Sequence, residues 1–129
     1  MRNTDWKFDN SMPIYSQLVY KIQLAIVSGE YALGQRLPAV RDMAAEAGVN
    51  PNTLQRAFQE LERLGLVYTQ RNSGRYVTED LKVITSTKKA LAEEQIRGFM
   101  DSMRRIGYSR EEIIRLLESG EKEEDNGNS

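Results

Sequence analysis

Two predicted helices with apolar stripes at helical spacing, joined through a turn of only four residues (48–51), constrain the fold of this chain more than any other feature. Gly48 stops a predicted helix over 39–47, while Asn50 and Pro51 are a good N-cap and a good first residue for the next helix. The stripes consist of Val40, Met43, Ala44 and Ala47 in the first helix and Leu54, Ala57, Phe58, Leu61 and Leu64 in the second. The pattern predicts two short helices joined by a tight turn.

The flanking segments complete a recognisable order of elements. Pro13 suits the first turn of a helix that ends at Gly29, and its apolar residues recur at helical spacing. After the pair, the β-rich runs 66–69 and 76–78 flank the polar loop 70–75, which predicts a hairpin with a basic tip. Helix, helix, turn, helix and hairpin is the order of a winged helix-turn-helix.

The expected fold class is therefore mainly α with a small β-hairpin. The C-terminal part adds a predicted helix over 86–106 and a second helix that begins at the capping box of Ser109 and Glu112 and ends at Gly120. The predicted domains are a flexible N-terminal arm (1–12), the winged helix-turn-helix domain (13–80), a two-helix dimerisation segment (81–120) and a disordered acidic tail (121–129).

The stripe on the C-terminal helices is broad enough to need a partner. A tail of about fifty residues has too few elements to bury itself, which favours pairing across a two-fold axis. The alternative is that these helices pack on the chain's own winged domain. The residues expected at the dimer contact are Leu91, Ile96, Phe99, Met100, Met103, Ile106, Ile113, Ile114 and Leu117.

Composition argues against an enzyme, a metal site and a membrane protein. The chain has no cysteine and no histidine, which excludes disulfides and zinc–thiolate sites and removes the commonest general base. Adjacent carboxylates such as Glu79-Asp80 fit caps or solvated faces better than catalysis. No apolar run approaches the roughly 18 residues of a membrane span, and no secretory signal is visible. We therefore expect a cytoplasmic binding protein without cofactor or metal.

The outer face of the helix that begins at Pro51 suits double-stranded DNA. At about 100° per residue, the face opposite the apolar stripe carries Asn52, Arg56, Gln59 and Arg63, with Thr53 and Gln55 on its flanks. Arginine can bond guanine through two donors, and Asn or Gln can bond adenine through a donor and an acceptor. The alternative is an ordinary solvated helix face.

The predicted hairpin strengthens the DNA interpretation. Arg71 and Arg75 flank a loop that contains Gly74, and no acid lies between Glu62 and Glu79. A loop tip with glycine can approach a groove closely, and arginine is favoured in a narrow minor groove. The formal net charge of −1 conceals this basic stretch, because acidic residues gather near the C-terminus. A plain solvated β-turn is the alternative here.

Many spaced positions over residues 13–78 resemble the GntR-type bacterial transcription regulators. The matching motifs are Pro13-Ile14-Tyr15, Gly34-x-x-Leu37-Pro38-Ala39-x-Arg41, Gly48-Val49-Asn50-Pro51-Asn52-Thr53-Leu54-x-Arg56-Ala57-Phe58-x-x-Leu61-Glu62-x-x-Gly65 and the wing Arg71-x-x-Gly74-x-Tyr76-Val77. The short C-terminal part and the Asn50-Pro51-Asn52-Thr53 helix start resemble the YtrA-type branch of that family.

The resemblance implies a homodimer formed by the C-terminal helices and repression of an operon, often one that encodes an ABC transporter. It gives Arg41 a DNA contact from the start of the second helix, places Thr53 and Arg56 among the recognition-helix contacts, and places Gly74 at the wing tip. Pro51 and Gln55 stand where the larger family commonly has a basic residue and an arginine, so base preference does not transfer.

The functional hypothesis is a homodimeric regulator, a repressor, on a pseudo-palindromic operator with half-sites about 34–36 Å apart or a multiple of that. The turn that contains Asn50 would fix the recognition helix against the DNA backbone or base edges. The alternative is a winged helix used for protein–protein contact without DNA binding. Neither the operator sequence nor a small-molecule effector is readable from the residues.

Overall fold

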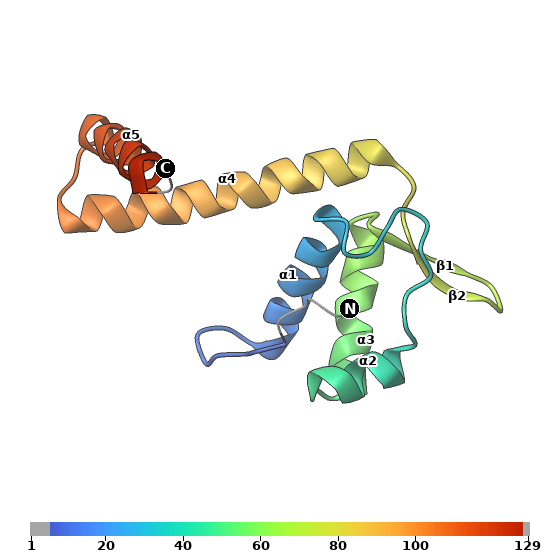
Figure 1. Ribbon diagram of the computed structural model, residues 1–129. Coiled ribbons are helices and arrows are strands. Elements are labelled where there is room, and N and C mark those ends of the chain that lie inside the picture. The colour runs from blue at the N-terminus through green and yellow to red at the C-terminus, as the bar shows by residue number, and fades with distance from the viewer. Residues whose placement is uncertain (1–5, 128–129) are drawn as a thin grey trace. The chain divides into compact units, whose positions relative to one another are not determined.

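The computed structural model describes the backbone of residues 6–127 and the side chains of residues 6–120 (Figure 1). Its elements are α1 (Ile14–Val27), α2 (Val40–Ala47), α3 (Pro51–Arg63), β1 (Val67–Gln70), β2 (Gly74–Val77), α4 (Leu81–Ile106) and α5 (Arg110–Gly127). This order confirms the predicted winged helix-turn-helix with a two-stranded hairpin. The chain divides into two compact units, Met1–Lys88 and Lys89–Ser129, with the boundary inside α4.

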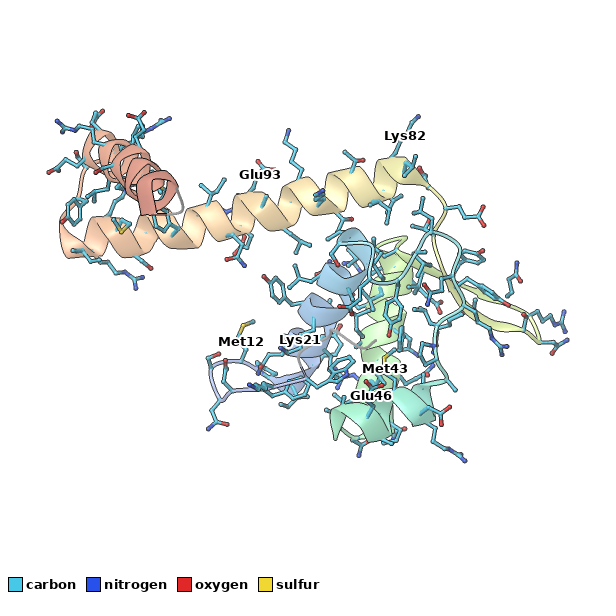
Figure 2. All side chains as sticks on the ribbon, in the orientation of Figure 1. Met12, Lys21, Met43, Glu46, Lys82 and Glu93 are labelled. Atoms are coloured by element: carbon cyan, nitrogen blue, oxygen red, sulfur yellow. The ribbon has the colours of Figure 1, made fainter. Side chains whose placement is uncertain are left out.

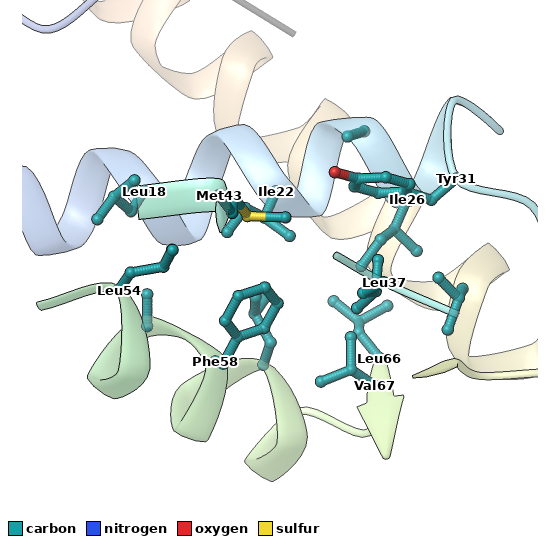
Figure 3. Close-up of a cluster of buried hydrophobic side chains, with 14 of the residues drawn as sticks. Leu18, Ile22, Ile26, Tyr31, Leu37, Met43, Leu54, Phe58, Leu66 and Val67 are labelled. Atoms are coloured by element: carbon teal, nitrogen blue, oxygen red, sulfur yellow. The ribbon is translucent and has the colours of Figure 1, made fainter. Parts of the chain in front are cut away.

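One apolar core holds the first unit together (Figure 3). It draws on every element from α1 to β2, so burying it fixes the three helices and the hairpin in one arrangement. Its largest fully buried members include Leu18, Ile22, Met43, Leu54, Phe58, Leu61, Leu66 and Val77.

The turn between α2 and α3 has the geometry that its residues predict. Gly48 adopts a left-handed backbone with φ of 70°, which favours glycine. The side chain of Asn50 caps α3 by accepting a 2.7 Å hydrogen bond from the backbone N–H of Asn52, and Pro51 is the first residue of α3. Ala39, by contrast, gives α2 no side-chain cap. Local chemistry therefore fixes the start of α3.

The hairpin pairs β1 and β2 in antiparallel register, from Val67 opposite Val77 to Gln70 opposite Gly74. Strand β1 begins one residue later than the sequence predicted, and β2 begins two residues earlier. The connector between α1 and α2 supports the other side of β2: the backbone N–H of Leu37 donates to the carbonyl of Arg75 at 2.9 Å, and Arg36 forms a bridge with Tyr76. The wing is thus held along both edges of β2.

Helix α4 begins at Leu81, five residues before the predicted start at Ser86. The carboxylate of Asp80 accepts a 2.9 Å hydrogen bond from the backbone N–H of Lys82, so it satisfies one of the free donors at the helix start. Val83 and Ile84 pack against the core of the first unit and hold this extra turn.

The N-terminal residues that the structure describes differ from the predicted flexible arm. Trp6 and Phe8 pack against the core. The ammonium of Lys21, which is labelled in Figure 2, lies 5.6 Å from the centre of the Phe8 ring. The side chain of Gln17 donates to the backbone carbonyls of Asp9 and Met12. Residues 6–12 are therefore anchored to α1, while the rest of the predicted arm lies outside the described residues.

The second unit contains the C-terminal part of α4 and α5, which Figure 1 draws folded back beside it. The predicted capping box is present: Ser109 Oγ accepts from the N–H of Glu112 at 3.2 Å, and the Glu112 carboxylate accepts from the N–H of Ser109 at 3.0 Å. Helix α5 passes through Gly120, where the sequence predicted its end, and continues to Gly127. Residues 128–129 of the predicted tail lie outside the described residues. No helix in the described part of the chain is long and apolar enough to span a membrane.

Candidate nucleic-acid interface

The outward face of α3 carries the predicted row of polar side chains. Asn52, Arg56 and Gln59 are exposed, while Thr53 and Gln55 are half-buried on its flanks. The opposite face is buried in the core. The core therefore orients α3 so that donors and amides point to solvent, as a helix that enters a major groove requires.

Arg56 is supported by α1. Its guanidinium lies 5.0 Å from the centre of the Tyr15 ring, in a cation–π contact. Tyr15 belongs to the Pro13-Ile14-Tyr15 motif at the start of α1, and its side chain is half-buried against the core. The contact restricts the side chain of Arg56 without using its hydrogen-bond donors, so they stay available at the exposed face.

Arg63, at the end of α3, is paired with Glu60 one turn earlier. Its Nε donates to the two carboxylate oxygens of Glu60 at 2.8 and 2.9 Å, and Nη2 also contacts that carboxylate. These hydrogen bonds hold the pKa of Glu60 below its ordinary value and raise that of Arg63. The predicted face therefore carries a carboxylate beside one of its cations.

Arg75, predicted as a DNA contact, is instead engaged within the protein. Its Nε donates to Glu62 Oε1 at 2.9 Å, its Nη1 donates to Gln55 Oε1 at 3.3 Å, and its guanidinium lies 5.1 Å from the centre of the Phe58 ring. Only 18% of its side chain is exposed. The sequence could not reveal this arrangement, because its partners lie 13 to 20 residues away on α3.

Glu62 joins both strands of the hairpin to α3. Besides Arg75 from β2, it accepts a 2.5 Å hydrogen bond from the hydroxyl of Thr69 on β1. Partial burial favours the neutral carboxyl, yet the bonds from Thr69 and Arg75 outweigh it and keep the pKa of Glu62 below its ordinary value. The wing is consequently tied to α3 by an ionised carboxylate.

The wing tip carries the predicted Arg71 and Gly74 in a tight turn. Arg71 is exposed, and its neighbour Asn72 takes a left-handed backbone with φ of 64°. Gly74 has a φ of 132°, and a Cβ at this position would lie 3.1 Å from Nε of Arg36. The glycine therefore lets the exposed Arg36 lie close along the hairpin, which adds to the interface a cation that the sequence did not single out.

Arg41 and Asn50 occupy the two sides of the turn that precedes α3. Arg41 is the second residue of α2, and its side chain is exposed. Asn50 is also exposed, but its side-chain oxygen is used to cap α3. Arg41 is thus free to meet a ligand with its full set of donors, whereas Asn50 offers its amide N–H groups.

The predicted dimer contacts fall into three groups. Ile96, Phe99, Ile106, Ile114 and Leu117 are exposed, and Leu91, Met100 and Met103 are half-buried. Ile113 differs, because it is 1% exposed and belongs to the interior of the second unit rather than to its surface. Leu116, which the sequence did not single out, is 46% exposed on α5.

The described residues hold no cluster of three or more metal-ligating side chains. The groups that the first unit presents are arginines, amides and hydroxyls, and these suit hydrogen bonding to base edges and phosphates.

Comparison with known proteins places this arrangement in a family. Residues 14–77 match the family of bacterial regulatory proteins named gntR. The chain is 39% identical to the HTH-type transcriptional regulator YhcF of Bacillus subtilis over 110 residues, covering 85% of this chain and 91% of that protein. It is 31% identical to the HTH-type transcriptional repressor YtrA of Bacillus subtilis over 105 residues, covering 81% of each.

A solved structure of a member of the same family also resembles this chain. A GntR family transcriptional regulator from Listeria monocytogenes superposes with a TM-score of 0.80 at 39% identity, covering 87% of this chain and 98% of that chain. The family match lies within the first unit, while the likeness to these relatives, which covers 81–87% of this chain, reaches into the second. The chain therefore belongs to the GntR family of bacterial regulatory proteins, which are transcription regulators with a DNA-binding helix-turn-helix.

Proposed function

We propose that this chain is a homodimeric repressor that binds a pseudo-palindromic operator, with one α3 helix in the major groove of each half-site. The observation that carries the proposal is the polar face of α3, where Asn52, Arg56 and Gln59 are exposed on a helix whose other face is buried in the core. The repressor assignment draws support from the likeness to YtrA.

The exposed donors and amides of α3 read the bases. Arg56 is expected to bond guanine through two donors, because stacking on Tyr15 leaves its guanidinium edge unused. Asn52 and Gln59 can each donate to and accept from adenine. Each such pair discriminates against the wrong base by about 1–3 kcal/mol.

Exposed cations on either side of α3 contact the phosphates. Arg41 lies at the start of α2, and Arg36 and Arg71 lie along the hairpin. Contacts of this kind fix the register of the protein on the duplex without reading its sequence. We expect the wing to follow the minor groove next to the half-site that α3 reads.

The exposed apolar side chains of α4 and α5 form the dimer contact. A two-fold axis between copies would match the symmetry of an inverted repeat, with half-sites about 34–36 Å apart or a multiple of that. The transporter operon suggested by the family resemblance is one place to look for such a repeat.

Selection of binding sites from random duplex DNA, at near-physiological salt, tests the proposal. The expected result is an enriched inverted repeat bound by two chains. Weak, salt-sensitive binding without enrichment would leave only the phosphate contacts, and the absence of binding at low salt would support the protein–protein alternative instead.

Arg56→Ala makes the same test at one residue. We expect the variant to lose about 1–3 kcal/mol on the selected site and to relax the preference at one base pair. Arg97→Ala is the matched control, because Arg97 is an exposed arginine on α4 outside the proposed interface. If Arg56→Ala binds the selected and scrambled duplexes as the wild type does, Arg56 does not read a base.

A further inference from the structure

Arg75 occupies a position between the wing and the recognition helix, and only 18% of its side chain is exposed. It donates to Glu62 and to Gln55, and it packs over Phe58. All three partners lie on α3, while Arg75 itself lies on β2. This side chain therefore fixes the hairpin against α3 rather than extending toward a ligand.

The contact with Gln55 also fixes which end of its amide faces outward. A glutamine amide has one acceptor oxygen and one NH₂ group with two donors. Nη1 of Arg75 is a donor, so the oxygen must turn toward it, at the observed distance of 3.3 Å. The NH₂ group is then the part of Gln55 that remains for a ligand at the flank of the exposed face.

A glutamine whose amide oxygen is turned to Arg75 presents its NH₂ group and recognises different bases from a freely rotating amide. The two-bond contact to adenine, in which the amide accepts from N6 and donates to N7, requires the amide oxygen to face the base instead of Arg75. With the oxygen turned to Arg75, adenine offers the NH₂ group only N7 and sets its own N6 donor beside it. Guanine offers two acceptors, O6 and N7, and thymine offers O4. Cytosine presents a donor, N4, and is the poorest match.

We infer that Arg75 is a positioning residue that makes Gln55 select guanine or thymine over adenine at one base pair of each half-site. The inference rests on the proposed DNA-binding function. It replaces the predicted direct DNA contact of Arg75 with an indirect role, in which Arg75 acts on DNA only through the orientation of Gln55 and of the wing.

Binding-site selection with four proteins tests the inference: wild type, Arg75→Ala, Gln55→Ala and the double variant. Wild type is expected to prefer guanine or thymine over adenine by about tenfold at one position, and Gln55→Ala should lose that preference. Arg75→Ala should bring adenine at the same position to near equality, because the amide can then rotate. In the Gln55→Ala background, the second substitution should change nothing further at that position.

Arg75→Lys separates positioning from charge. Lysine keeps the cation but lacks the fork of donors that holds Glu62 and Gln55 together, so the base preference should fall while the dependence of binding on salt stays as in wild type. A phosphate contact would give the opposite pattern: Arg75→Ala would flatten the log–log salt slope by about one per contact, and the base preference would persist.

The outcomes distinguish this inference from the proposed function. An unchanged base preference in Arg75→Lys, with a thermal unfolding transition that shows the variant folds, would overturn the role of Arg75 while the DNA-binding function stands. A wild-type chain that enriches no sequence would overturn the proposed function, and the inference would fall with it.

Discussion

The substitution Phe99→Asp tests whether the chain dimerises through the exposed apolar side chains of the second unit. The set, here called the apolar face, comprises Ile96, Phe99, Ile106, Ile114, Leu116 and Leu117, each between 42 and 69% exposed. Within the part of this unit whose side chains are described, Ile113 alone is buried. A two-helix unit with so small an interior needs a further surface against which to bury its apolar residues.

The expected magnitude follows from these exposures. Six large side chains, each about half exposed, leave on the order of 600 Å² of surface per chain, or about 1,200 Å² for two chains, which is the lower end for a stable interface. Phe99, at 42% exposed, contributes roughly 80 Å² per chain. Losing that area from both copies costs about 4 kcal/mol, which raises the dimer dissociation constant by about 1,000-fold. Two buried carboxylates would add to this cost.

Sedimentation equilibrium over a range of concentrations measures the dissociation constant directly. Ala90→Asp is the matched control, because it adds the same charge to the same helix at an exposed position outside the apolar face. We expect Phe99→Asp to be monomeric where the wild type and the control are dimeric. A dimer that tolerates Phe99→Asp would show that the apolar face is not the interface, and a monomeric wild type would refute the homodimer itself.

Three further predictions concern single side chains. Tyr31→Phe should raise the free energy of unfolding by about 1 kcal/mol in urea titrations, because the buried hydroxyl of Tyr31 has no hydrogen-bond partner among the described residues. A variant less stable than the wild type would show that the hydroxyl does have a hydrogen-bond partner. Glu60→Gln should release Arg63 to contact a phosphate, which tightens binding to any duplex and steepens the log–log dependence of the binding constant on salt by about one per chain. An unchanged slope would show that Arg63 does not contact DNA. The folded-state pKa of Glu62 lies below its ordinary value of 4.5. Its contribution to stability is therefore complete above pH 4.5 and is lost as the pH falls through the folded-state pKa. Glu62→Gln should therefore lose less stability than wild type on acidification, and parallel curves would contradict this.

The elements that the sequence predicted well are those whose causes are local. Gly48, Asn50 and Pro51 lie within four residues of one another, and each acts through its own backbone or the next turn. The polar face of α3 was likewise predictable, because a helix with one apolar stripe must turn its other side outward. Local rules therefore located the recognition helix and its exposed residues.

The start of α4 and the end of α5 were missed because weak local signals were overridden. Asp80 caps α4, but the first turn of that helix is retained by packing of Val83 and Ile84 on a core that periodicity alone does not reveal. A glycine inside a helix costs only about 1 kcal/mol, so Gly120 was a poor stop signal. The helix passes through it to Gly127.

The roles of the arginines were the least predictable part of the site, because a side chain's charge does not reveal its partners. Arg63 and Arg75 carry the same charge as Arg41, yet each is paired with a carboxylate of α3. These carboxylates reduce the positive potential of α3, and non-specific affinity depends on how many phosphates a protein neutralises. In the proposed function, pairing these cations lowers the affinity of α3 for random DNA, so the contacts that depend on base identity supply a larger share of its binding energy.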